Sequence, residues 1–226
     1  MADRCLLYYI TDRTQFPGDE SARRRALLAK IAQAARSGVD YIQLREKDLS
    51  TRKLEALARE AVVAVRENQL VTSHWPPTTR LLINSRTDVA LAAGADGVHL
   101  RAEDVSAAEV RGIVERFTDH WPLTTNHFHI AASCHTAADV IRAESEGADF
   151  AAFAPVFEKR DRPSTQPAGL AALHEACRSK IPVLALGGVT LANAASCLEA
   201  GAAGIAAIRL FQENKIEDVV RALRAL

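Results

Sequence analysis

The feature that most constrains the fold of this chain is a glycine-led triplet that recurs four times at nearly constant spacing. Gly-Val-Asp at 38–40 is followed by Gly-Ala-Asp at 94–96 and 147–149 and by Gly-Ala-Ala at 201–203, at intervals of 56, 53 and 54 residues. Each triplet follows a helical pattern and precedes a short apolar run, as expected of a glycine that ends a helix before a strand. Each interval therefore holds two strand–helix units.

Counting these units along the chain predicts a barrel. Alternating strands and helices are typical of a parallel sheet covered by helices, and eight units favour a closed (β/α)8 barrel over an open doubly wound sheet, the alternative. With 226 residues, 48% of them hydrophobic, the chain fits one domain, so we expect a single (β/α)8 TIM barrel over residues 1–226. Ser21 and Ser50 are the expected N-caps of the first two helices. The expected strands are residues 6–10, 41–44, 80–84, 97–100, 129–133, 150–154, 182–186 and 204–208.

Composition excludes several classes of function. Lys plus Arg and Asp plus Glu number 28 each, and the only basic run is residues 23–25, so nucleic acid is not an expected partner. No apolar run approaches the roughly 18 residues of a membrane span, and the first residues lead into a strand without a secretory pattern, so we expect no membrane partner and a cytoplasmic location. The four cysteines lack metal-ligand spacing and are expected to be reduced and buried: Cys5, Cys134, Cys177 and Cys197.

Polar residues after the second strand are the first candidates for a site, because such barrels build their sites at the carboxyl ends of the strands. Gln43, Arg45 and Lys47 are two residues apart, so they share one face if the extended conformation continues past Leu44. Such a face would attract an anion. The alternative is a strand with a solvated charged end.

A phosphate site is expected after the seventh and eighth strands. Gly187 and Gly188 follow the seventh strand, where a glycine backbone can approach an anion closely, and Arg209 follows the eighth. A guanidinium group there would bind phosphate or carboxylate as a fork. The alternative for the glycine pair is a tight turn that requires positive φ.

His135 is the best candidate for general acid or base catalysis in the sequence. It follows the fifth strand and lies two residues after Ser133, so both can face the site while Cys134 faces away. The alternative is a structural or helix-capping histidine. His120 and His127 precede the fifth strand, on the other face of the barrel, and we expect surface histidines rather than metal ligands there.

Several motifs in order along nearly the whole chain resemble the thiamine phosphate synthase and thiazole tautomerase (TenI) family. They include residues 10–13, 43–48, 95–100, 133–136 and 185–189. The resemblance implies a (β/α)8 barrel that binds thiazole phosphate carboxylate. The synthase branch joins the thiazole to hydroxymethylpyrimidine diphosphate, using Mg²⁺ and releasing pyrophosphate, whereas the tautomerase branch only moves a proton to aromatise the thiazole.

Most departures from the synthase pattern lie at the residues that would bind magnesium and diphosphate. Ser85 stands where the synthase pattern has a magnesium-binding aspartate, and a neutral hydroxyl is a poorer ligand for Mg²⁺. The second magnesium carboxylate is retained as Asp104, although Arg101 and Ala102 replace the usual Gly-Gln before it. Residues 158–162 replace a Pro-Thr-x-Thr-Lys loop, with Arg162 in place of the lysine. Arg209 replaces a serine near the thiazole phosphate.

These departures favour a tautomerase-like member that needs no cofactor. In that hypothesis His135 moves the proton, while the Gly187-Gly188 loop and Arg209 hold phosphate. A divergent synthase, with Mg²⁺ at Asp104, is the alternative, and a non-catalytic ligand-binding barrel is the third. The substrate is expected to be a small phosphorylated heterocycle, and the residues leave open whether the chain forms a homo-oligomer. The expected substrate-binding residues are Gln43, Arg45, Lys47, Asn84, Ser133 and Arg162.

Overall fold

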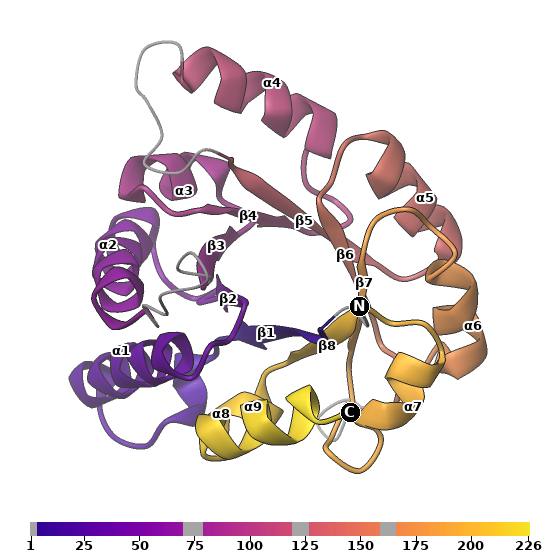
Figure 1. Ribbon diagram of the computed structural model, residues 1–226. Coiled ribbons are helices and arrows are strands. Elements are labelled where there is room, and N and C mark those ends of the chain that lie inside the picture. Colours follow the sequence, from indigo (N-terminus) through magenta and orange to yellow (C-terminus); the bar gives the residue numbers. More distant parts are fainter. Residues whose placement is uncertain (1–3, 70–78, 119–126, 159–165) are drawn as a thin grey trace.

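The computed structural model describes residues 4–69, 79–118, 127–158 and 166–226, in which eight parallel strands pair in sequence order and the last returns to the first. The sheet is therefore a closed barrel, ringed by helices (Figure 1). The predicted barrel is confirmed and the open doubly wound sheet is wrong. The strands are β1 (Leu6–Ile10), β2 (Tyr41–Leu44), β3 (Arg80–Asn84), β4 (Gly97–Leu100), β5 (His129–Cys134), β6 (Phe150–Phe153), β7 (Val183–Leu186) and β8 (Gly204–Ala207).

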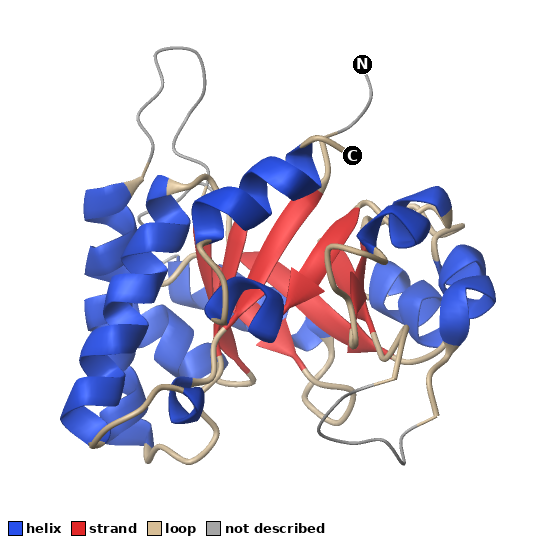
Figure 2. Cartoon of the chain, turned by 90° about the horizontal axis from the view of Figure 1, so that it is seen from below, coloured by secondary structure: helices blue, strands red, loops and turns tan. Residues whose placement is uncertain are grey.

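The helices lie outside the strands and cover them (Figure 2). None of the described helices is long and apolar enough to cross a membrane. A short 3₁₀ helix, η1 (Arg13–Gln15), follows β1, and the one-turn helix α8 follows β8. The α-helices are α1 (Glu20–Arg36), α2 (Thr51–Asn68), α3 (Thr87–Ala93), α4 (Ala107–Thr118), α5 (Ala137–Ser145), α6 (Gly169–Ala176), α7 (Ala194–Glu199), α8 (Arg209–Gln212) and α9 (Ile216–Arg224).

The predicted bounds are close, and the differences lie at element ends. The first four strands have the predicted bounds, β5 is one residue longer, and β6, β7 and β8 are each one residue shorter. The predicted N-cap Ser21 is wrong, because Asp19 caps α1 by accepting a hydrogen bond from the Ala22 N–H at 2.8 Å. Ser50 is the N-cap residue of α2, although its side chain makes no capping hydrogen bond to the described residues.

The glycine triplets share one local structure. Gly38, Gly94, Gly147 and Gly201 have φ of 78°, 67°, 83° and 98°, the left-handed conformation with which helices commonly end. In the first three triplets the aspartate accepts a hydrogen bond from the backbone N–H of the preceding odd-numbered strand and returns its own N–H to the carbonyl of the same residue. The pairs are Asp40 with Leu7 (2.7 Å), Asp96 with Leu81 (2.8 Å) and Asp149 with Ile130 (2.6 Å).

Strand residues alternate between two apolar cores. Leu7 and Tyr9 on β1 pack outward against the helices, whereas Tyr8 and Ile10 point into the barrel. The barrel interior is filled mainly by large side chains, including Tyr8, Leu82, Phe150 and Leu184, so it is a packed core and not a channel. Space for a ligand is left at the carboxyl ends of the strands.

Candidate functional site

A buried hydrogen-bonded chain leads from the barrel interior toward the carboxyl ends of the strands. The Tyr8 hydroxyl lies 2.9 Å from Nδ1 of His99, and Nε2 of His99 lies 2.7 Å from the Ser133 hydroxyl. Burial, reinforced by the charge of Arg45, lowers the pKa of His99 to about 3, so the ring is neutral at pH 7. A neutral imidazole has one donor and one acceptor, so one of the two hydroxyls donates to the ring and the other accepts from it.

The loop after β2 is held in place by a buried ion network that the sequence reasoning missed. Glu46, with a side chain only 1% exposed, accepts hydrogen bonds from the Thr11 hydroxyl at 2.6 Å and from the backbone N–H and guanidinium of Arg13. Arg13 also donates to both carboxylate oxygens of Asp48, at 2.6 and 2.8 Å. The signal was available, because these residues belong to motifs 10–13 and 43–48 of the family resemblance.

The surroundings shift the pKa values of the network's groups in different directions. Burial raises the pKa of Glu46, opposed by the hydrogen bonds from Thr11 and Arg13. The hydrogen bonds from Arg13 lower the pKa of the exposed Asp48 carboxyl, and Asp48 in turn raises the pKa of Arg13. A permanently charged Arg13 among three carboxylates, those of Glu46, Asp48 and Glu20, is the centre of the network.

The expected shared face of Gln43, Arg45 and Lys47 stays a prediction, because strand β2 ends at Leu44 and its pairing does not reach Arg45 and Lys47. Gln43 is buried, with its amide nitrogen 3.5 Å from Oδ1 of Asn84, whereas Lys47 is exposed. Arg45 is half-buried, and its backbone N–H donates to the Thr11 hydroxyl at 3.0 Å.

A cavity of about 210 Å³ lies at the carboxyl ends of β2, β3 and β4 and joins several predicted residues. Lys47, Arg86 and Arg101 bring positive charge to its wall, and Asn84 and Ser85 bring hydrogen-bonding groups. The other lining residues are Leu44, Glu46, Leu49 and Leu54. The wall is suited to a polyanion such as a diphosphate.

Ser85 and Asp104 are the described residues that could hold the magnesium ion of a synthase. Ser85 has a φ of 63°, a left-handed conformation that aspartate and asparagine adopt more readily than serine. Burial would raise the pKa of Asp104, but hydrogen bonds from Arg101 and from the Ser85 hydroxyl outweigh it and lower that pKa. Arg101 donates to Asp104 through its backbone N–H and its guanidinium, both at 2.8 Å.

This donor set fits a magnesium ion that is shared with a substrate. Mg²⁺ in proteins commonly takes one or two carboxylates and completes its shell with substrate phosphates and water. One carboxylate and one hydroxyl supply part of that shell, and the Arg101 side chain is 43% exposed and can turn away.

His135 is exposed at the end of β5, and its ring is oriented by the backbone. Nδ1 lies 2.6 Å from the carbonyl oxygen of Ala154, and because a carbonyl can only accept, Nδ1 carries the proton. In the neutral ring Nε2 is therefore the basic nitrogen. Cys134 is buried against the helices, as expected, and burial raises its pKa to about 12.

The glycine pair after β7 makes the tight turn that the sequence left as an alternative. Gly187 and Gly188 have φ of 95° and 67°, and a Cβ added to Gly188 would lie 2.5 Å from the carbonyl oxygen of Glu158. The Asn193 amide donates to the Gly188 carbonyl at 3.1 Å. Phosphate binding at this turn stays a prediction.

Arg209 follows β8, as predicted, but the strand ends at Ala207 and not at residue 208, and Arg209 is the first residue of the one-turn helix α8. It lines a second cavity, of about 510 Å³, together with Gln15, Phe16, Gln212 and Glu213. Gly187 and Gly188 are not among the residues that line this cavity. Arg162 lies outside the described residues.

Known proteins similar to this chain were found at the levels of family, sequence and structure. A family model described as thiamine monophosphate synthase matches residues 7–211. A putative thiamine-phosphate synthase of Geobacter sulfurreducens is 40% identical, over 97% of this chain and 93% of that protein, and a thiamine-phosphate synthase of Methanoculleus marisnigri is 39% identical, over 96% and 93%. The structure of a thiamine phosphate pyrophosphorylase from Pyrococcus furiosus superposes with a TM-score of 0.76 at 28% identity, covering 99% of this chain and 95% of that one.

Proposed function

The chain belongs to the thiamine monophosphate synthase family, and on that premise we propose that it is a synthase that joins hydroxymethylpyrimidine diphosphate to thiazole phosphate and releases diphosphate. The names of its relatives support this reaction over the tautomerisation that the sequence departures favoured. The observation that carries the proposal is the cavity walled by Lys47, Arg86 and Arg101, because a diphosphate leaving group requires concentrated positive charge.

In this reaction the new bond to the thiazole forms as the carbon–oxygen bond to the diphosphate breaks, and negative charge grows on the departing group. Lys47, Arg86 and Arg101 stabilise that charge, and Asn84 and Gln43 orient the pyrimidine end by hydrogen bonds. Asp104 and Ser85 would hold Mg²⁺, which supplies further neutralisation of the diphosphate when bound. The hydrogen-bonded chain from Tyr8 through His99 fixes the Ser133 hydroxyl for substrate binding.

The experiment is to incubate the protein with hydroxymethylpyrimidine diphosphate, thiazole phosphate and Mg²⁺ and to measure thiamine phosphate by chromatography. We expect product from the wild-type protein and roughly 10²-fold or greater loss in Lys47→Met, by the size of single electrostatic contributions. Lys53→Met is the matched control, since Lys53 is an exposed lysine on α2. Absence of product from the wild-type protein would overturn the proposal.

A tautomerase is the second candidate, and the observation that favours it is the orientation of His135. Because its Nδ1–H donates to the Ala154 carbonyl, Nε2 of His135 can accept a proton from one position of a thiazole carboxylate tautomer and return it to another. Exchange of deuterium into that tautomer, lost in His135→Ala and without thiamine phosphate formation, would favour this activity over the synthase. Exchange that is undiminished in the variant would exclude His135 from the step.

A further inference from the structure

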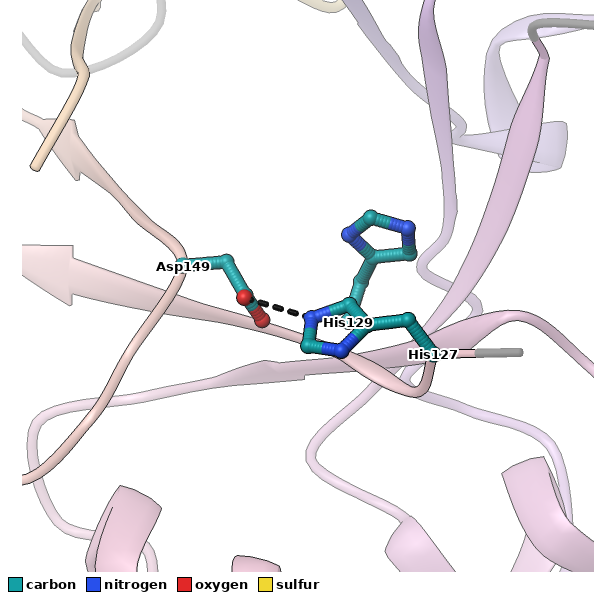
Figure 3. A group of neighbouring side chains, drawn as sticks. All are labelled: His127, His129 and Asp149. Atoms are coloured by element: carbon teal, nitrogen blue, oxygen red, sulfur yellow. Dashed lines mark hydrogen bonds and ion pairs between the residues drawn. The ribbon is translucent and has the colours of Figure 1, made fainter. Parts of the chain in front are cut away.

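Three side chains converge at the end of the barrel opposite the proposed active site (Figure 3). His129 is the first residue of β5, His127 lies two residues before it, and Asp149 lies directly before β6. Their ligand atoms all lie within 4.8 Å of one another. Figure 3 shows the Asp149 carboxylate facing the His127 ring, with the His129 ring beside them. Two imidazoles and a carboxylate are a common set of protein ligands for zinc and related metals.

The carboxylate is already oriented by groups that leave one of its oxygens facing the rings. Oδ2 of Asp149 accepts the Ile130 backbone N–H and the Arg111 guanidinium, both at 2.6 Å. Oδ1 lies 2.7 Å from Nε2 of His127, the contact drawn in Figure 3. A metal-binding carboxylate is usually held in this way by hydrogen bonds from outside the coordination sphere.

His129 carries an unusual feature for a partly buried histidine. Its Nδ1 is inaccessible to solvent and has no hydrogen-bond partner among the described residues, whereas buried polar atoms are nearly always paired. The ring packs edge-on against Tyr41 and against His127, with centroids 5.7 and 4.8 Å away. The ring is thus held at the cluster without a hydrogen bond to satisfy that nitrogen.

We propose that His127, His129 and Asp149 bind one divalent transition metal ion, of which Zn²⁺ is the best match, with water in the remaining position. Nitrogen ligands select against Mg²⁺, so this site is chemically distinct from Asp104 and Ser85 at the other end of the barrel. Tetrahedral ligands about 2.1 Å from zinc are about 3.4 Å apart, so Nε2 of His127 and Oδ1 of Asp149, now 2.7 Å apart, must separate, and the wider separations, up to 4.8 Å, must close. His127, whose side chain is 52% exposed, has the freedom to move in this way.

The proposed metal would join the segment just before β5 to the start of β6. Any ligand that binds the folded chain and not the unfolded chain stabilises the fold, so Zn²⁺ would raise the melting temperature. The prediction replaces the expectation that His127 is only a surface histidine. That expectation placed the residue on the correct face but could not foresee that Asp149, 22 positions later, is its neighbour.

The test is isothermal titration of the full-length protein with Zn²⁺ in excess Mg²⁺, with Co²⁺ absorption in the visible as a second readout. We expect one ion per chain in the wild-type protein and at least tenfold weaker binding in His127→Ala, which removes a half-exposed side chain and leaves the strands intact. His174→Ala, a change of another exposed histidine, and Asp104→Asn are the controls and are expected to bind Zn²⁺ as the wild type does.

Three results of the titration would contradict a metal site at His127, His129 and Asp149. Absence of saturable one-to-one binding in the wild-type protein, or equal affinity in wild type and His127→Ala, would overturn the proposal, including the case in which the four thiols are the true ligands. Loss of binding in Asp104→Asn alone would place the metal at the other end of the barrel and would also overturn it. Circular dichroism of each variant without metal establishes that a loss of binding is not a loss of fold.

Discussion

The two halves of the carboxyl-end rim are built by different means. The residues that follow β1 to β4 hold one another through side chains: Arg13 with Glu46 and Asp48, and Arg101 with Asp104. Among the described residues that follow β5 to β8, two site candidates depend on the backbone: His135 contacts a carbonyl, and Gly188 has a positive φ. Removal of a charged side chain should therefore destabilise the first half, and a methyl group added to a glycine should destabilise the second.

The largest effect is expected for Arg13→Ala. The variant leaves the Glu46 carboxylate buried without its guanidinium partner, and breaking a buried ion pair on one side typically costs about 3–5 kcal/mol. Urea unfolding measures the change in the free energy of unfolding. Arg24→Ala, which breaks the more exposed pair with Glu60, is the control and should cost no more than about 1 kcal/mol. Equal losses of unfolding free energy in the two variants would show that the ion pairs of Arg13 stabilise the fold no more than the exposed pair of Arg24.

The second half is tested by Gly188→Ala. Positive φ alone strains an alanine, and here its Cβ would also meet the Glu158 carbonyl oxygen at 2.5 Å, so we expect a loss of roughly 2–3 kcal/mol. Gly147→Ala is the matched control, because Gly147 has a φ of 83° and nothing within 4 Å of the added atom. That variant should lose about 1 kcal/mol. If both glycines tolerate alanine equally, the close approach at Gly188 is not a constraint.

How well the sequence predicted a feature depends on how far apart along the chain the interacting residues are. Strand bounds and the glycine triplets depend on neighbouring residues, and these predictions held to within one residue per strand end. The ion network pairs Arg13 with Glu46, 33 positions away. The role of Asp40, Asp96 and Asp149 as acceptors from the previous strand depends on which strands are neighbours in the sheet. Patterns along a chain predict which face a residue occupies but not which partner it meets there.

Arg209 shows the same limit at an element end. The apolar run before it predicted a strand that continues to residue 208, but β8 ends at Ala207 and Arg209 opens a short helix. The cavity that Arg209 lines also contains Gln15 and Phe16, about 190 positions earlier, which a local pattern cannot identify as its neighbours. Site residues at loop boundaries are therefore harder to place than the strands that carry them.

The buried chain through His99 predicts a pH dependence of stability. The pKa of His99 falls from an unfolded value of about 6.5 to about 3, so between these values the unfolded chain binds more protons and stability falls as the pH falls. From pH 6.5 to 5 this group alone should remove roughly 1.5 kcal/mol. Comparing urea unfolding of wild type and His99→Gln across that window isolates the contribution. An identical slope in the two proteins would show that His99 is not held neutral.

The smallest effect is expected for Ser85→Asp, in the first half of the rim, at the position where the synthase pattern has a magnesium-binding aspartate. Ser85→Asp places a second carboxylate beside Asp104 in a backbone conformation that aspartate adopts readily. We expect the Mg²⁺ concentration for half-maximal thiamine phosphate formation to fall about tenfold, or about 1.4 kcal/mol. Ser85→Asn, which suits the same backbone without the charge, is the control and should leave the Mg²⁺ requirement unchanged. A Mg²⁺ requirement that Ser85→Asp does not alter would mean that the cations of the cavity wall, and not a metal held at Asp104, neutralise the diphosphate in this chain.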